Sequence, residues 1–280
     1  MKELTPVERI ETLELFPPLS RELLAVLRSL QTEDWARPTV CGDWTVKDVA
    51  AHLLGGNLGR LWNRSKTSRP ADATQPGFDE LVVLINRGNE EWVQAARRIS
   101  PEILVEFLEL TDVHLDEHFK HLPPEEPARI TVAWASDEIP PNWFDVAREY
   151  TEKWLHQQHI REAVGKPLLL MPEFYHPVLD TFIRGLPRAY RPVAAADGKS
   201  VTVQIRGPAG GVWALLRENN QWVLYKGGNP GAASRVTIGQ DLAWRLFTRG
   251  ISPAAARPKV QIEGDVRLGE KVLDTVSITA

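Results

Sequence analysis

The chain of 280 residues is long enough for two domains, and its 43% apolar and 25% charged residues match a folded protein with a sizeable core, which excludes an intrinsically disordered chain. Its 33 basic and 37 acidic side chains give a net charge of -4, so no excess positive charge favours nucleic acid or anionic membranes as partners. The single cysteine, Cys41, excludes intrachain disulfides and thiolate-rich metal sites.

The first helical pattern extends from Val7 to Leu30, where apolar residues recur at helical spacing. Pro17-Pro18 lies inside it, so we expect a break or a kink there. The segment from Met1 to Glu14 carries six charged side chains and lacks the apolar segment of a secretion signal. Apolar runs such as Leu168 to Met171 are too short to cross a bilayer, so we expect a cytoplasmic protein without a membrane partner.

A second helix is predicted to begin at Thr45, because Thr45 and Asp48 have the spacing of a capping box. Gly55-Gly56 is a possible weak point within it. The preceding segment, Thr32 to Asp43, has no apolar period and predicts a loop. Further helices are expected over residues 78–99, 101–122 and 145–164, the last ended by Gly165-Lys166-Pro167.

The pattern changes after about Pro177 to short alternating runs separated by turn residues, which favours strands. We expect strands over 201–205, 212–216, 222–225, 235–238, 259–263 and 275–279, and a helix over 242–248. The sequence therefore predicts an N-terminal helical domain over residues 1–170 and a smaller C-terminal α+β domain over residues 178–280.

Glu152, His156 and His159 follow one another at helical spacing, so they project from one side of the predicted helix over 145–164. A carboxylate and an imidazole one turn apart can chelate a divalent ion such as Zn²⁺. The apolar residues of that helix point largely the other way, so a solvated polar face is the alternative interpretation.

A second group has similar spacing: His114, Glu117, His118 and His121. Its neighbours are charged and prolines follow at once, which favours a solvated helix end.

Two further side chains have both a functional and a structural interpretation. His52 lies near the apolar side of the helix that begins at Thr45, where a lone histidine is more often a core residue than a ligand. Cys41 precedes the same helix start and is either a soft ligand or nucleophile near a metal, or a small buried loop residue, which is the simpler interpretation.

Residues 36–54 read A-R-P-T-V-C-G-D-W-T-V-K-D-V-A-A-H-L-L, and this string resembles the DinB-like superfamily, in particular its branch with the mycothiol-dependent maleylpyruvate isomerase N-terminal domain. Glu152-x-x-x-His156 fits the second signature of that family, together with the later residues Arg161, Ala163, Gly165 and Pro167. Residues 242–250 and 263–268 are similar, less specifically, to the sterol-carrier-like companion domain of those isomerases.

The resemblance implies a four-helix bundle that holds one divalent metal, zinc or alternatively nickel, between its helices. Carried over residue by residue, the ligands would be His52, Glu152 and His156. It also implies a low-molecular-weight thiol as cofactor and an assisting arginine from the C-terminal domain. Arg249 matches that arginine better than Arg245 does.

This chain departs from the family pattern at His159, where many relatives have an aspartate. An aspartate there could orient a ligand imidazole. We expect His159 to take part in catalysis, although a fourth metal ligand, a general base and a hydrogen-bond partner are all open roles for it.

Three functions follow from these residues. The first is a metal-dependent, thiol-using transferase or isomerase that acts on a small electrophilic substrate. The second is a metal-dependent hydrolase with His159 as base, and the third is a small-molecule-binding protein without catalysis. The partners expected are a small-molecule substrate and the thiol, and the sequence leaves the oligomeric state open.

Overall fold

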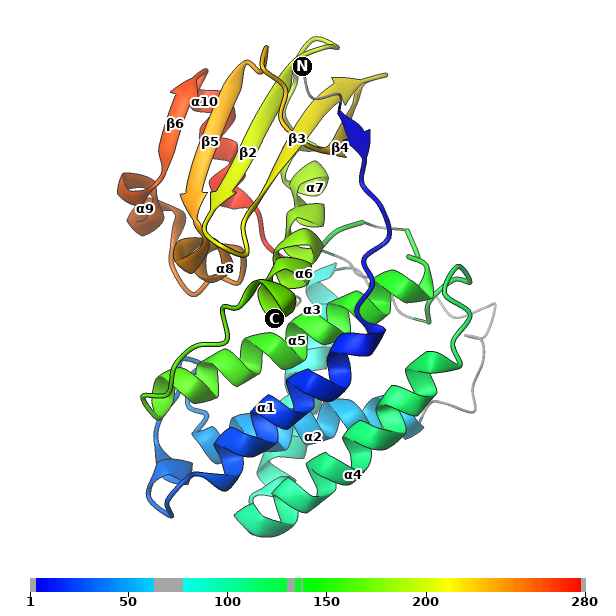
Figure 1. Ribbon diagram of the computed structural model, residues 1–280, viewed down its shortest axis with the longest axis vertical. Coiled ribbons are helices and arrows are strands. Elements are labelled where there is room, and N and C mark those ends of the chain that lie inside the picture. Colours follow the sequence, from blue (N-terminus) through cyan, green and yellow to red (C-terminus); the bar gives the residue numbers. More distant parts are fainter. Residues whose placement is uncertain (1–3, 63–77, 130–133, 137, 278–280) are drawn as a thin grey trace. The chain divides into compact units, whose positions relative to one another are not determined.

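The computed structural model describes residues 4–62, 78–129, 134–136 and 138–277, which form two compact units (Figure 1). The helical unit comprises Glu11–Ile130 and Ile139–Leu169, and the sheet unit comprises the described parts of Met1–Ile10, Thr131–Glu138 and Leu170–Thr279. One boundary between the two units lies between Leu169 and Leu170. Residues 4–10 and the described residues near 135 group with the sheet unit.

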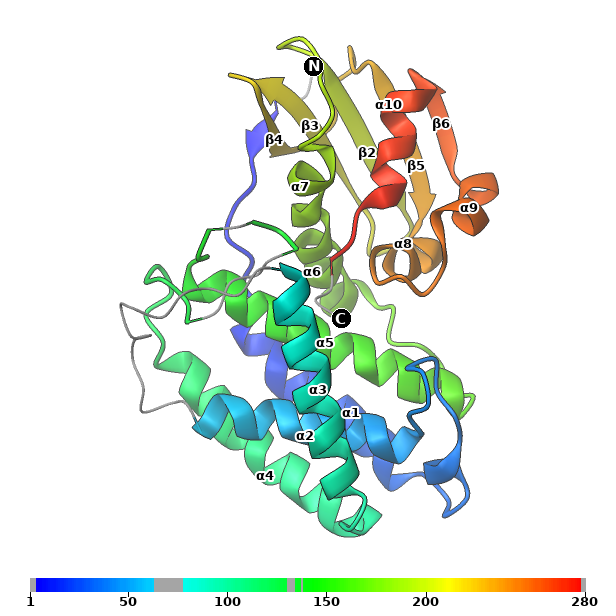
Figure 2. The same cartoon turned by 180° about the vertical axis from the view of Figure 1, so that it is seen from behind.

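The helical unit is built from long helices, as the apolar periodicity predicts. They are α1 (Phe16–Arg28), α2 (Val46–Trp62), α3 (Phe78–Ala96), α4 (Pro101–Lys120) and α5 (Asn142–Ala163). Helices α1, α2, α4 and α5 pack against one another, and α3 packs on α2 (Figures 1 and 2). The predicted all-α N-terminal bundle is confirmed. Among the described residues, no helix has both the length and the apolar character needed to cross a membrane.

The expected break at Pro17-Pro18 is wrong, because α1 begins at Phe16 and both prolines lie in its first turn. Backbone N–H groups in the first turn have no partner within a helix, so prolines cost no hydrogen bond there. A short 3-10 turn, Leu13–Leu15, precedes α1.

Helix α2 starts with the predicted capping box. The backbone N–H of Asp48 donates to Thr45 Oγ1 (3.3 Å), and the backbone N–H of Thr45 donates to Asp48 Oδ2 (3.0 Å). The helix continues unbroken through Gly55-Gly56. Gly55 is where the indole of Trp92 packs, since a Cβ added there would lie 2.5 Å from the Trp92 ring. This glycine therefore allows α3 to approach α2 closely.

The sheet unit contains a six-stranded sheet in the order β1-β4-β3-β2-β5-β6. Its strands are β1 (Thr5–Pro6), β2 (Ser200–Arg206), β3 (Gly211–Glu218), β4 (Gln221–Lys226), β5 (Ser234–Gly239) and β6 (Gln261–Gly264). The pair β2–β5 is parallel and the other pairs are antiparallel. Helices α7 (Leu186–Tyr190) and α10 (Val266–Glu270) cover one face of the sheet, while α8 (Gln240–Phe247) packs beside β2 and β5 (Figure 2).

The predicted C-terminal α+β domain is confirmed, with two differences. The expected strand over 275–279 is wrong for residues 275–277, which follow a 3-10 turn, Lys271–Asp274, and pair with no strand; residues 278–279 lie outside the described part. Helices α6 (Pro172–Phe182), α7 and α10 were not predicted; prolines within and beside α6 and α7 conceal their helical pattern.

Candidate metal centre

Helix α5 is the most deeply buried helix of the helical unit. Between Phe144 and Arg161 only four side chains are not fully buried: Arg148, Glu152, His156 and His159. Polar residues beside them, such as Gln157 and Gln158, have no exposed surface. The interpretation of this side as a solvated polar face is therefore wrong: a narrow polar stripe reaches partial exposure within an otherwise buried helix.

His52 on α2 lies opposite this stripe. Its ring centroid is 4.6 Å from that of His156, and the two rings meet nearly edge to face. His156 Nε2 lies 3.5 Å from Glu152 Oε2. One donor atom from each of His52, Glu152 and His156 can be chosen so that all three lie within 4.8 Å of one another. The structure thus brings together the three residues that the family resemblance implied as ligands.

This donor set fits a divalent transition metal. Two imidazoles and one carboxylate are a known ligand set of catalytic zinc sites, which keep a further position for substrate. The side chains of His156 and Glu152 keep 13% and 27% of their surface exposed, so the cluster is open on one side. His52 and Glu152 come from two different helices, so the packing of α2 on α5 sets the distance between them.

The protonation of the cluster follows from burial and from the charges within it. Burial lowers the pKa of His52 to about 4, and the neighbouring His156 acts in the same direction. Burial would also lower the pKa of His156, but hydrogen bonds to Cys41 and Glu152 outweigh it and raise this pKa to about 9. Burial would raise the pKa of Glu152, but His156 and Arg148 outweigh it and lower this pKa to about 2. A cation that binds His156 therefore displaces a proton.

Two neighbours hold the cluster in place. Trp44 packs against the His52 ring with a centroid distance of 5.2 Å. Arg148 Nη1 lies 3.8 Å from Glu152 Oε1, and the same guanidinium donates to Glu149 Oε2 (2.8 Å) and to Asp145 Oδ1 (3.3 Å). Such outer contacts orient metal ligands.

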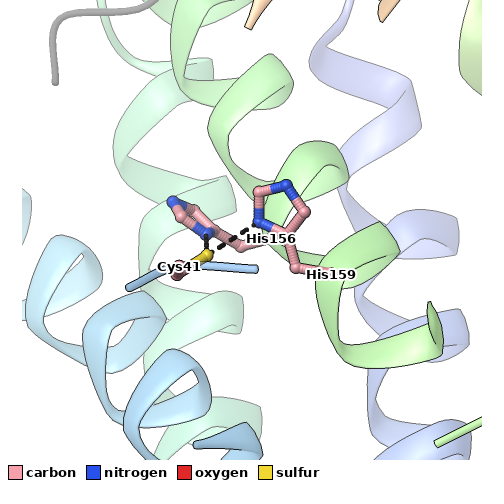
Figure 3. A group of neighbouring side chains, drawn as sticks. All are labelled: Cys41, His156 and His159. Carbon is pink, nitrogen blue, oxygen red and sulfur yellow. Dashed lines mark hydrogen bonds between the residues drawn. The ribbon is translucent and has the colours of Figure 1, made fainter. Parts of the chain in front are cut away.

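Cys41 lies on the other side of His156, in the loop before α2 (Figure 3). Its Sγ is 3.0 Å from His159 Nδ1 and 4.0 Å from His156 Nδ1. The loop is held by the pairing of Thr39 with Trp44, and Gly42 takes a left-handed backbone (φ 59°) that allows the chain to turn. The prediction of a simple buried loop residue missed this contact, because only the folded loop brings Cys41 to α5.

The other predicted site residues lie elsewhere. Arg249 belongs to the sheet unit, just after α8, where its side chain is exposed. His114 and Glu117 are exposed on α4, and His121 just beyond α4 is exposed as well, so this second group lies on the solvent side of the helix end, as expected.

Comparison with known proteins gives a family match over residues 16–161, to the mycothiol maleylpyruvate isomerase N-terminal domain. A crystal structure of a mutant mycothiol-dependent maleylpyruvate isomerase is similar, with 13% identity, a TM-score of 0.50 and coverage of 91% of this chain and 92% of that chain. This likeness shows a shared fold.

Two weaker structural matches accompany it. Another crystal structure of the mycothiol-dependent maleylpyruvate isomerase has 12% identity, a TM-score of 0.48 and coverage of 84% and 86% of the two chains. The sterol carrier protein domain 2 of Helicoverpa armigera has 18% identity and a TM-score of 0.25, and covers 36% of this chain and 80% of its own. Comparison with curated proteins found no match.

Proposed function

Because the chain belongs to the mycothiol maleylpyruvate isomerase N-terminal domain family, we propose that it is a divalent-metal-dependent enzyme that uses a low-molecular-weight thiol on a small electrophilic substrate, as an isomerase or S-transferase. The observation that supports this most directly is the convergence of His52, Glu152 and His156 from two helices in a half-buried cluster. Zinc, with nickel as the alternative, suits these donors.

When bound, the ion would supply Lewis acidity and favour the thiolate form of the thiol. His52, Glu152 and His156 would hold it, and Arg148 would keep the Glu152 carboxylate in its ligating orientation. The buried walls around the stripe on α5 would limit the access of water, which strengthens the electrostatic interactions at the centre.

His159 would serve as the proton carrier of the reaction. In thiol addition to an electrophilic double bond, the S–H proton leaves to a base, an S–C bond forms, and the carbon pair accepts a proton. Reversal of the addition after rotation about the new single bond yields an isomer and returns the thiol, so the balance needs no oxidant or reductant. His159 lies one helical turn from His156, with ring centroids 5.3 Å apart, close enough to serve the same reacting group.

Arg249 would assist by pairing with an anionic group of the substrate, as the family resemblance implies. Its guanidinium is suited to carboxylates because it donates in a planar fork. If so, Arg249→Ala should raise KM for an anionic substrate, while Arg235→Ala, an exposed arginine of the same unit, should leave KM unchanged. Equal KM values for both variants would remove Arg249 from the proposal.

The function is tested by turnover of a panel of electrophiles, including maleylpyruvate, with mycothiol present or omitted. We expect turnover that requires the thiol, disappears on treatment with a chelator and returns with zinc. His52→Ala should abolish it, and His114→Ala, a histidine on the exposed end of α4, should not. Activity that persists in His52→Ala or after chelation would refute the metal-dependent mechanism.

The thiol requirement separates the competing functions. A metal-dependent hydrolase on the same residues would turn over its substrate without any thiol. A small-molecule-binding protein would show no turnover under either condition.

A further inference from the structure

A second set of metal-binding side chains lies beside the first and does not contain His52 or Glu152. Cys41 Sγ, His156 Nδ1 and His159 Nδ1 converge from the loop before α2 and from α5 (Figure 3). One donor atom from each of these residues lies within 4.8 Å of the other two. Their chemistry differs from that of the first set, because a thiol replaces the carboxylate.

The distances suit a tetrahedral site. With zinc–sulfur and zinc–nitrogen bonds of the usual lengths, a sulfur and a nitrogen on neighbouring corners are about 3.5 Å apart. The two measured sulfur–nitrogen distances, 3.0 and 4.0 Å, lie on either side of that value. Small shifts of the side chains would therefore seat an ion without any rearrangement of the helices.

His156 belongs to both sets through different faces of its ring. Its Nε2 faces Glu152, at 3.5 Å, whereas its Nδ1 faces Cys41. A neutral imidazole has one nitrogen free to accept a metal at a time. When His156 ligates an ion in one set, it therefore cannot ligate an ion in the other set.

The loop that carries Cys41 is prearranged for this role. Thr39 Oγ1 accepts from the Cys41 backbone N–H (3.1 Å) and donates to the Trp44 carbonyl (2.8 Å). The Thr39 hydroxyl therefore links the backbone at Cys41 to the backbone at Trp44. Cys41 and both histidines are half-buried, which leaves an entry for an ion while limiting exchange with solvent.

We propose that Cys41, His156 and His159 form a second, alternative site for a thiophilic divalent cation such as Zn²⁺ or Cd²⁺. As the ion binds, the Cys41 S–H bond breaks and its proton passes to solvent, because the thiolate is the ligand. An ion held there occupies His156 and His159 together. If the proposed function holds, an ion at this second site prevents His156 from holding the catalytic ion and therefore inhibits the reaction.

The test uses Co²⁺ as a spectroscopic probe in the full-length His52→Ala protein, where the first set has lost a ligand. We expect one equivalent of Co²⁺ to bind with the near-ultraviolet charge-transfer band of a sulfur–cobalt bond. The band should vanish in the His52→Ala/Cys41→Ser double variant, and His159→Gln in the same background should weaken cobalt binding at least about tenfold. Glu152→Gln replaces His52→Ala if that variant does not fold, with the same expectations.

Three results would overturn the proposal. One is that His52→Ala and Glu152→Gln both bind no cobalt. Another is cobalt bound in these variants without a sulfur band. The third is a sulfur band in the unaltered protein that disappears with His52, since sulfur would then be a fourth ligand of the first set. These readouts do not involve turnover, so they stand apart from success or failure of the proposed reaction.

Discussion

Helix α5 carries two clusters of polar and charged side chains, which differ in the interactions that their polar atoms make. In the closed network, Asp145 and Glu149 on α5 pair with Arg60 on α2 and with Arg148. In the open stripe of Glu152, His156 and His159, partly exposed donor atoms converge on one another and on Cys41 and His52. Arg148 contacts both clusters.

The difference indicates which cluster stabilises the fold and which is available for a ligand. Arg60 Nη2 donates to Asp145 Oδ1 (2.8 Å), Arg60 Nη1 donates to Asp145 Oδ2, and Arg60 Nε donates to Glu149 Oε2 (3.2 Å). Burial raises the pKa of Asp145, but Arg60 and Arg148 lower it further than burial raises it. Each charge in the closed network thus has an opposite charge at hydrogen-bond distance, whereas the open stripe gathers metal-binding atoms. Changes in the two clusters should therefore have opposite consequences.

The largest effect is expected from His156→Ala, because His156 contributes to both candidate donor sets. Zinc content, measured by elemental mass spectrometry on tag-free protein, should fall to background. The free energy of unfolding of the metal-free protein should fall by less than in Asp145→Ala, since the His156–Glu152 pair that is lost is partly exposed and the main helix contacts remain. His114→Ala is the matched control and should keep its zinc; zinc retained at full occupancy in His156→Ala would contradict both donor sets.

Asp145→Ala should lower the stability of the fold and leave zinc binding intact. It leaves the Arg60 guanidinium, whose side chain is only 16% exposed, without its main partner, and breaking a largely buried ion pair in this way costs about 3–5 kcal/mol of folding free energy. Urea denaturation measures this loss of stability. Under conditions where the variant is folded, it should still bind one equivalent of zinc. Arg87→Ala, which breaks an exposed pair with Glu91, is the control and should scarcely change stability. A loss as small as that of the control would mean that the closed network does not hold α2 to α5.

Arg148→Ala tests the contact between the clusters. Without the guanidinium near Glu152 Oε1, the carboxylate loses an orienting charge, and zinc affinity should fall about tenfold, or about 1.4 kcal/mol. Competition against a chelating dye measures the affinity. An unchanged dissociation constant would show that Glu152 is positioned by the helix alone.

The smallest effect is a change in stability at acidic pH, and it concerns the ion pair between Asp112 and Lys153. Burial would raise the pKa of Asp112, but Lys153, Ser20 and Asn57 outweigh burial and hold this pKa below its ordinary value. The unfolded chain then takes up the proton first as the pH falls, so the stability from this pair is complete above the unfolded pKa and is lost as the pH falls through the folded pKa.

Urea denaturation between about pH 5 and pH 3 should therefore show stability decreasing with acid, and less steeply in Asp112→Asn. Parallel pH dependences for the two proteins would contradict the assigned role of Asp112. Glu152 and His52 also titrate in this range, but they do so in both proteins, so the difference between the two pH dependences reports on Asp112.

The sequence predicted the features that depend on neighbouring residues. The capping box at Thr45 and Asp48 and the stop at Gly165 (φ 66°) involve only a few residues each, and both occur in the structure. The convergence of His52 with Glu152 and His156 came from the family resemblance, since spacing alone cannot place a residue of one helix opposite another.

The features that were not predicted depend on contacts between residues far apart in the sequence. The burial of α5 could not be predicted, because its polar side chains find their partners on other helices: Lys153 Nζ, for example, donates to Asn57 Oδ1 (2.6 Å) and Asp112 Oδ1 (2.9 Å). The contact of Cys41 with His159 likewise requires the folded loop at Gly42. The proposed role of Arg249 in the reaction stays a prediction.

The short strand β1 has a consequence for the order in which this chain is made. Thr5 pairs with Lys226 and Pro6 with Tyr225, so β1 leaves the ribosome before all the helices of the helical unit and must wait for β4 before it finds its partner. During translation the helices can assemble while the edge of β4 does not yet exist. A fragment cut near residue 170 would separate the two strands, leaving one edge of the sheet uncovered and available to other chains.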